Sequence, residues 1–193
     1  KFTSESQIKV GDKVVLQGVL TSYNGTPEVT SGSQLVTLNG STTGGSSEEG
    51  ESITEAATDM GFTDKGAAGT VTLSDGTTLA FDKGEGTNVP TYYAGSYAAV
   101  RMYANNTLTI TTTGKKIAKI TITANDPDTK EYNGNDQAYA MSGETKVTIT
   151  KVSGTQVEFS SLSASTITIV NAFTGTGGGV QLRIKSITIT YAK

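Results

Sequence analysis

Apolar and polar side chains alternate along most of this chain, as they do in β-strands that bury one face. The alternation is clearest in the closing segment 181–191, whose apolar positions are Leu182, Ile184, Ile187, Ile189 and Tyr191. The first two of these positions are even and the last three are odd. Because a strand exposes and buries alternate residues, this change of parity predicts a bulge or a bend near Lys185 and Ser186.

Further strands are expected wherever a short alternating run is bounded by glycine, asparagine or aspartate turn residues. They fall at 13–20, 34–38, 69–73, 77–82, 98–103, 107–112, 116–123, 146–152, 156–159 and 166–170. Ser74, Asp75 and Gly76 predict a hairpin between two of them. Their even spacing predicts an all-β fold, a jelly-roll-like antiparallel β-sandwich.

One composition break divides the chain. Segment 41–52 is rich in glycine, serine and threonine, carries glutamates and has no large apolar side chain, which predicts a linker. It separates a β unit at 1–40, with an Asn24-Gly25 turn, from a sandwich domain at 53–193. A unit of two or three strands buries too little surface to fold alone. We therefore expect it either to dock on the following domain or to belong to a domain with earlier strands.

The start of the second domain fits two interpretations. Ser52 and Glu55 have the spacing of a helix capping box, and the apolar residues that follow fall on one helical face. Those residues are Ile53, Ala56, Ala57 and Met60. A short helix and an irregular strand both account for this segment.

Composition excludes several kinds of chemistry. The chain has no histidine and no cysteine, so Ser-His-Asp and Cys-His catalysis and ordinary zinc sites are excluded. A formal net charge of -3, without a basic stripe, argues against nucleic acid as a partner. No apolar run is long enough to span a bilayer. The acidic residues are scattered without the pairing that a glycosidase needs, so we expect no enzymatic activity.

One aromatic cluster is a candidate ligand site. It consists of Tyr92, Tyr93, Tyr97, Arg101 and Tyr103. Flat aromatic faces with nearby polar groups are suited to sugars, and strand alternation places the larger side chains of 97–103 on one face. Tyrosines of this kind also commonly border a sandwich core, so both interpretations stand.

Two further groups of residues carry oxygen ligands or positive charge. Segment 125–136 gathers hard oxygen ligands for calcium, in Asp126, Asp128, Asn133 and Asp136. It does not match the spacing of an EF-hand, and such residues are equally typical of turns. No other cofactor is expected. A modest basic surface is the other group, although its cations are more typical of solvated strand edges: Lys115, Lys116, Lys119, Lys151 and Arg183.

Two stretches resemble known modular proteins. IKVGDKVVLQGVLTSYNGTPEVTSGSQLVTLNG, at 8–40, resembles the C-terminal part of OB-fold domains in secreted and surface lipoproteins of Gram-negative bacteria. VPTYYAGSYAAVRMYANNTLTI and GGGVQLRIKSITITY resemble the β-sandwich that often follows such domains. This resemblance implies a partial OB-fold-like unit that lacks its earlier barrel strands, followed by a carbohydrate-binding or adhesive sandwich.

The expected function follows from the composition and the resemblance together. We expect a non-catalytic module, extracellular or on the outer cell surface, that binds a polysaccharide or other glycan. The alternative is a structural or adhesive module that binds another protein or spaces domains on the surface. Its oligomeric state is left open.

Overall fold

The computed structural model describes residues 13–17, 20–29, 34–38, 41–42, 49–124, 132–134, 137–153, 155–173 and 181–193. The chain divides into two compact units, Lys1–Ser46 and Ser47–Lys193. All regular elements among the described residues are β-strands. Accordingly, none of these residues belongs to a helix that is long and apolar enough to cross a membrane.

The described residues of the first unit form five short strands. They are β1 (Val14–Gln17), β2 (Leu20–Tyr23), β3 (Thr26–Val29), β4 (Gln34–Leu38) and β5 (Ser41–Thr42). β1, β4 and β5 form one antiparallel sheet, and β2 and β3 form a hairpin. Asn24 and Gly25 have φ of 50° and 80°, the positive values that a two-residue type I′ turn needs. The turn predicted at these two residues is confirmed.

The described strands of the second unit form three antiparallel sheets. The six-stranded sheet has, in spatial order, β14 (Thr145–Thr148), β13 (Ala138–Ser142), β17 (Thr166–Asn171), β11 (Thr107–Thr111), β8 (Thr78–Asp82) and β7 (Thr70–Thr72). The five-stranded sheet has β15 (Thr150–Lys151), β16 (Gln156–Phe159), β12 (Ile117–Thr123), β19 (Ser186–Ala192) and β6 (Glu49–Ala56). The three-stranded sheet has β18 (Leu182–Ile184), β10 (Ala99–Met102) and β9 (Thr91–Tyr93).

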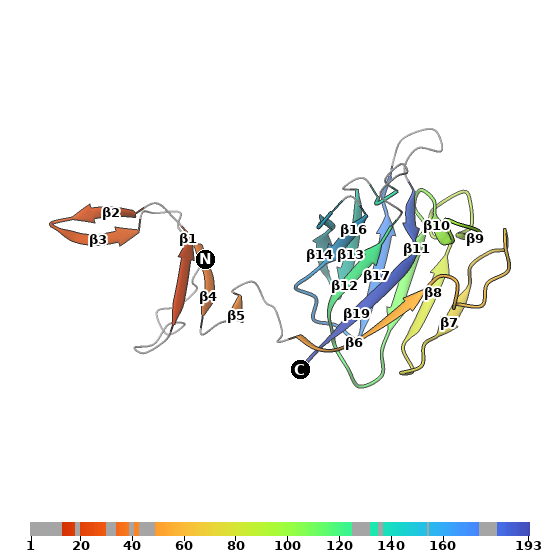
Figure 1. Ribbon diagram of the computed structural model, residues 1–193, viewed down its shortest axis with the longest axis horizontal. Coiled ribbons are helices and arrows are strands. Elements are labelled where there is room, and N and C mark those ends of the chain that lie inside the picture. The colour runs from red at the N-terminus through yellow and green to blue at the C-terminus, as the bar shows by residue number, and fades with distance from the viewer. Residues whose placement is uncertain are drawn as a thin grey trace. The chain divides into compact units, whose positions relative to one another are not determined.

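The sheets pack as a sandwich, in which the dark blue β19 crosses the strands of the six-stranded sheet (Figure 1). Each sheet turns its apolar side chains into a common core. Residues without solvent exposure come from all three sheets, and include Leu79, Val100, Met102, Leu108, Ile110, Ile120, Ile122, Phe159, Ile167, Ile169, Leu182, Ile184, Ile187 and Ile189. The all-β antiparallel sandwich expected from the alternation is confirmed.

β18 and β19 are consecutive along the chain and are separated only by Lys185. β18 pairs with β10 in the three-stranded sheet, and β19 pairs with β12 in the five-stranded sheet. Lys185 and Ser186 are both half-exposed, between the buried Ile184 and Ile187. The predicted change of face at this point is confirmed. It occurs where the chain passes from the three-stranded sheet to the five-stranded sheet.

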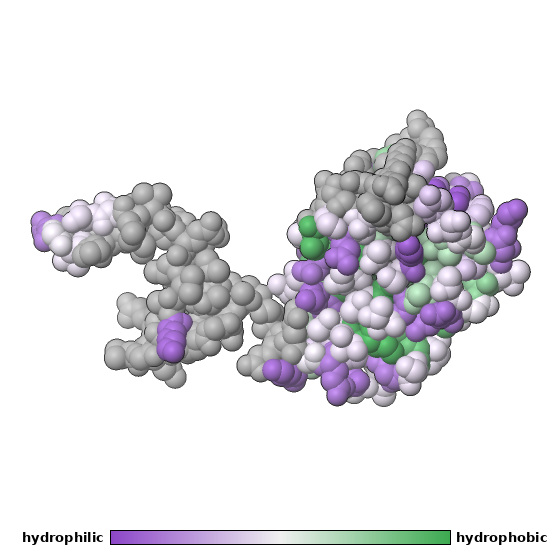
Figure 2. Space-filling view, viewed as in Figure 1, coloured by the Kyte–Doolittle hydropathy of each residue, from purple (hydrophilic) through white to green (hydrophobic). Residues whose placement is uncertain are grey.

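Threonine accounts for much of the outward-facing surface of the sheets. Thr54 Oγ1 lies 2.8 Å from Thr188 Oγ1 across β6 and β19, and Thr109 Oγ1 lies 3.2 Å from Thr168 Oγ1 across β11 and β17. β-branched side chains favour extended backbone, and paired hydroxyls satisfy each other across strands. On the face in Figure 2, the second unit shows strongly hydrophilic residues among residues of intermediate hydropathy, with some hydrophobic residues exposed between them. The composition thus reflects paired strands with polar outer faces.

Two expectations at the start of this unit need correction. The helix considered from Ile53 onward does not form, because Glu49–Ala56 is strand β6, paired with β19. The last residues of the expected linker 41–52 are therefore part of β6, and its first two residues form β5. β9 and β13 are additional strands that the alternation did not predict, and the strand expected at 146–152 is interrupted at Ile149.

A buried asparagine holds the connection between β10 and β11, which lie in different sheets. Asn106 has no exposure, and its Oδ1 accepts a hydrogen bond from Tyr103 N at 2.8 Å. Its Nδ2 donates to Lys83 O at 3.0 Å and to Asn88 O at 2.7 Å. The side chain therefore ties the loop after β8 to the loop after β10. The two loops approach so closely that a Cβ on Gly86 would lie 2.4 Å from Ala104 O.

Asn171, at the end of β17, secures the same connection from the other side. Its Nδ2 donates to Met102 O at 3.0 Å and to Tyr103 O at 3.2 Å. Its backbone exchanges hydrogen bonds with the loop, from Asn105 N at 2.7 Å and to Asn106 O at 3.0 Å. Tyr103 thus leaves β10 with its backbone N–H and C=O both fixed by asparagine side chains.

Ile122→Ala should lower the free energy of unfolding by about 2–5 kcal/mol, because it removes a fully buried side chain from the core. Thr121→Ala, on the opposite face of β12, should cost less than about 1 kcal/mol. Urea unfolding curves of the two variants measure both values. Equal losses would contradict the assignment of the two faces.

Asn106→Ala should lower the free energy of unfolding by at least about 2 kcal/mol, because it removes three hydrogen bonds. Asn88 O and Tyr103 N lose their side-chain partner, and Lys83 O keeps only the bond from Gly86 N. Asn88→Ala is the control in the same loop, since the Asn88 side chain is exposed. Thermal unfolding followed by circular dichroism should separate the two variants. If Asn106→Ala lost no more stability than Asn88→Ala, the hydrogen bonds of the Asn106 side chain would contribute nothing to the stability of the fold.

Candidate functional site

The outer face of the three-stranded sheet carries the candidate site. The sheet is extended at both edges by short bridged segments. Beyond β18, Arg183 N donates to Tyr132 O at 2.9 Å and Asn133 bridges to Leu182. Beyond β9, Ala67 bridges to Thr91. Side chains from several distant parts of the sequence therefore share this face.

Strand register places two arginines directly opposite each other. Arg101 of β10 pairs with Arg183 of β18 on one side and with Thr91 of β9 on the other. The neighbours of these arginines along each strand, such as Val100 and Ile184, point into the core. Directly opposed side chains in an antiparallel pair have Cβ atoms about 4.5–5.5 Å apart. The two guanidinium groups are thus held on one face of the sheet.

Each arginine stacks on a tyrosine of the neighbouring segment, on the side away from the other arginine. The Cζ atom of Arg101 lies 3.6 Å from the ring centroid of Tyr93. The Cζ atom of Arg183 lies 3.4 Å from the ring centroid of Tyr132. We call these four residues the arginine–tyrosine platform. Stacking of a cation on an aromatic ring is attractive and fixes the position of the guanidinium.

Burial and like charge both act on the platform. Burial, followed by the charge of Arg101, lowers the pKa of Arg183 from its ordinary value. Burial, followed by the neighbouring Tyr93 hydroxyl, raises the pKa of Tyr103, which lies beside the platform. The ion pair found among the described residues joins Lys115 to Glu51 and involves neither arginine. Within the described part of the chain, the two positive charges therefore lack a neutralising carboxylate.

The platform keeps hydrogen-bond donors available although its members are stacked. Guanidinium N–H groups lie in the plane of the group, so a ring against one face leaves the edges accessible. Arg183 Nε donates to Gln181 Oε1 at 2.9 Å. No hydrogen bond from the Arg101 guanidinium to another described residue is found. All four platform residues are half-buried, so a ligand can reach their outer sides.

The structure brings three of the predicted ligand-site residues together. Tyr93, Arg101 and Tyr103 lie on this outer face, in contact or electrostatically coupled. Tyr97 lies in the turn between β9 and β10, half exposed at 50%, rather than on β10 itself. Its place at this turn leaves it at the border of the same sheet.

Tyr92 does not belong to the site. It alternates with Tyr93 on β9 and points into the core, where only 6% of it is exposed. Its ring centroid lies 6.3 Å from that of Phe62. The interpretation of adjacent tyrosines as a joint platform is therefore wrong for Tyr92, because consecutive strand residues face opposite sides.

Sequence reasoning missed Arg183 and Tyr132 as members of the site. Arg183 was grouped with the lysines as a solvated edge cation, whereas it lies on β18, the edge of its sheet next to the Tyr132 segment, and stacks on that tyrosine. The alternation of Leu182 and Ile184 did signal that Arg183 faces outward. Its pairing with Arg101 is a long-range property that the pattern does not contain.

The calcium interpretation is not tested by the described residues. Asp126, Asp128 and Asp136 lie outside them. Asn133 is described, and it is 7% exposed and bridged to Leu182 at the sheet edge. Among the described residues, no group of three or more acidic side chains could hold a metal ion.

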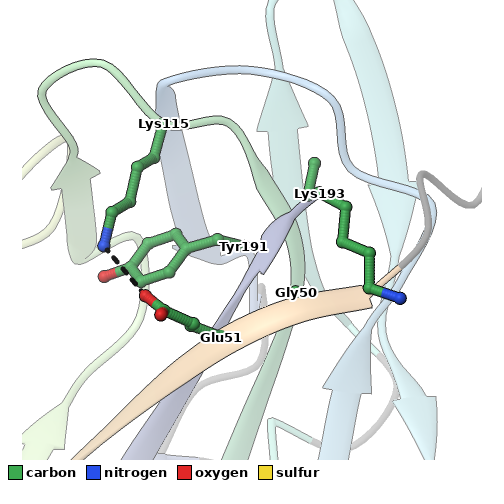
Figure 3. A pocket seen from close by; sticks show the side chains of 6 residues that line it. Gly50, Glu51, Lys115, Tyr191 and Lys193 are labelled. Carbon is green, nitrogen blue, oxygen red and sulfur yellow. Dashed lines mark ion pairs between the residues drawn. The ribbon is translucent and has the colours of Figure 1, made fainter.

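A second candidate is an open pocket of about 530 Å³ beside the start of β6 (Figure 3). Gly50, Glu51, Lys115, Tyr191, Ala192 and Lys193 line it. Lys115 Nζ lies 3.8 Å from Glu51 Oε2 and 4.5 Å from the Tyr191 ring centroid. Its charge is therefore already matched by a carboxylate, which leaves the pocket less suited to a ligand than the platform.

The tyrosine of this pocket has a structural role. Tyr191 of β19 donates its hydroxyl hydrogen bond to Asp75 and lies 2.7 Å from Thr77 Oγ1. Thr77 N also donates to Asp75 Oδ1 at 3.0 Å. Since Asp75 and Thr77 belong to the turn between β7 and β8, these bonds connect the six-stranded sheet to the five-stranded sheet.

Both ends of this connection titrate outside the neutral range. Burial and the hydrogen bond to Asp75 raise the pKa of Tyr191 to about 12. Burial alone would raise the pKa of Asp75, but hydrogen bonds from Tyr191 and Thr77, with the charge of Lys115, lower it overall. The connection is therefore intact across neutral pH.

Comparison of the chain with known protein families and with curated proteins finds no match to any family model and none to a curated protein.

Tyr191→Phe should reduce stability at neutral pH, and the difference from wild type should shrink above pH 10. A raised tyrosine pKa gives a stabilisation that is complete below the ordinary value of 10.0 and lost as pH rises towards about 12. The lowered pKa of Asp75 likewise gives a stabilisation that is lost as pH falls below about 4. Urea midpoints of both proteins from pH 3 to 11 test this. A difference that does not vary with pH would contradict it.

Proposed function

We propose that this protein is a non-catalytic module, extracellular or on the outer cell surface, that binds glycan on the face formed by the arginine–tyrosine platform, Tyr97 and Tyr103. The observation that carries the proposal is the pair of tyrosine rings, each stacked with an arginine, on an outward sheet face. Sugar rings combine apolar C–H faces with hydroxyl groups at their edges. Tyrosine rings suit the former, and guanidinium N–H donors suit the latter.

The shape of the site also favours an extended ligand. The platform lies on a sheet face rather than in a cavity, and Tyr97 adds a half-exposed ring at its border. An open face accommodates part of a long chain without enclosing its ends. The chain has no histidine or cysteine for nucleophilic or general-base catalysis, which supports binding without turnover.

Affinity electrophoresis in native gels that contain single polysaccharides, neutral and acidic, tests the proposal. Tyr93→Ala and Tyr97→Ala should each weaken retention about five- to tenfold, because each removes a ring contact with the ligand. Each gel is run with calcium and with a chelator, because segment 126–136 carries several oxygen ligands. Circular dichroism verifies that the variants are folded.

Tyr139→Ala is the matched control. Tyr139 lies on β13 of the six-stranded sheet with Lys146 Nζ 4.1 Å from its ring centroid, so it repeats the cation–tyrosine stack outside the candidate site. Its retention should equal that of wild type. Wild-type retention in the platform variants, or no retention of any polysaccharide by wild type, would overturn glycan binding here and favour a protein partner.

A further inference from the structure

Two like charges face each other on the platform at a position where a sheet normally avoids them. Like charges directly opposite each other destabilise an antiparallel pair. Arg101 and Arg183 nevertheless occupy paired positions, each half-buried. Among the described residues, neither guanidinium has an ion pair that offsets this repulsion. The arrangement would be relieved by an anion placed between or above the two groups.

The side chains that contact the two arginines fix the guanidinium groups in position before an anion binds. Tyr93 and Tyr132 hold the guanidiniums from opposite sides, and Gln181 accepts from Nε of Arg183. The remaining N–H groups are in-plane donors. A planar guanidinium binds carboxylate or sulfate oxygens through two parallel hydrogen bonds, and these charge-assisted bonds are about twice as strong as neutral ones. Because the donors are fixed before binding, less conformational freedom is lost when an anion arrives.

We infer that Arg101 and Arg183 form a subsite for the anionic group of an acidic glycan, a carboxylate or a sulfate ester. This inference rests on the proposed function and specifies the class of glycan. The sugar ring that bears the anion lies against Tyr93 or Tyr132, and the anion accepts hydrogen bonds from the arginines. The anion neutralises the repulsion across β10 and β18, so binding stabilises the sheet.

A glycan anion fits this surface better than a nucleic acid does. A nucleic-acid strand presents a phosphate at every nucleotide and is bound by a basic groove that follows the backbone. The chain carries a net charge of -3, and the pair is a local concentration of positive charge. The single anionic group of one acidic sugar needs only one such cluster of positive charge.

The experiment uses the complete chain and four probes in affinity gels: polygalacturonate, which carries carboxylates, dextran sulfate, which carries sulfates, neutral dextran, and single-stranded DNA. Arg101→Gln and Arg183→Gln should each weaken retention by at least one acidic polymer about tenfold or more, because each removes a charge-assisted hydrogen-bonding group. The two acidic polymers distinguish carboxylate from sulfate. Retention by neutral dextran should change less than twofold.

Lys146→Gln is the matched control, because it removes the same charge from a cation stacked on a tyrosine of another sheet. It should bind the acidic polymers as wild type does. An equal loss in Lys146→Gln would show a general charge effect and overturn the subsite. Wild-type retention in both arginine variants would also overturn it, while leaving glycan binding by the tyrosines intact. Arginine-dependent retention by DNA at least as strong as that by the acidic polysaccharides would replace the glycan with a polyphosphate.

A direct titration separates this inference from the proposed function. The arginine Nε–Hε signals are followed by NMR as sodium galacturonate, sodium sulfate or glucose is added to wild type and to Arg183→Gln. Saturating shifts with an anion, absent with glucose and in the variant, support the subsite even if no polysaccharide is retained. No shift with either anion in wild type overturns it.

Discussion

The structure of the second unit depends on one constraint, the burial of alternate side chains from three sheets in a common core. Residues such as Ile110, Ile122 and Ile189 have no exposure, so a shift of one residue in the pairing of their strands would bring polar side chains into the core. The register of the strands that bury side chains in this core is fixed in this way. Fixed register also decides what the outer faces carry, because each inward residue determines the direction of its neighbours. The threonine pairs and the arginine–tyrosine platform both lie on outer faces because the register of their strands is fixed.

The platform illustrates how such a fold gathers a site from distant residues. Its members come from β9, β10, β18 and the segment beside β18, and no two of them are adjacent in sequence. The side chains of Asn106 and Asn171 contribute to the position of the platform indirectly. They fix the backbone of Tyr103 at the point where the chain leaves β10 and crosses to the other layer. A rigid crossover at one end of β10 and the Lys185 junction beyond β18 hold the paired arginines in place.

The sequence predicted those features that depend on local alternation and missed those that depend on long-range pairing. The change of face at Lys185 was predictable because buried residues on both sides of it have opposite parity. The segment from Ile53 was ambiguous because its apolar spacing fits a helix as well as a strand, and the choice is made by β19, far along the chain. Tyr92 was misplaced because β9 has only three residues, too few for a visible alternation. The pairing of Arg183 with Arg101 likewise exists only in the folded sheet.

The ladder between β6 and β19 has a mechanical consequence. The two strands are antiparallel, and Glu49 is paired with Ala192 at the end of the ladder where β6 begins. A force that pulls these two residues apart would break the hydrogen bonds of the ladder one pair at a time. It would not load all of these hydrogen bonds at once, as a shearing force along the strands would. Glu51 and Ser52 of β6 are exposed, so resistance would begin at Ile53, which is opposite Ile189 and packs against the core. Under tension along this line, the unit would yield first at this edge while the platform sheet stayed intact.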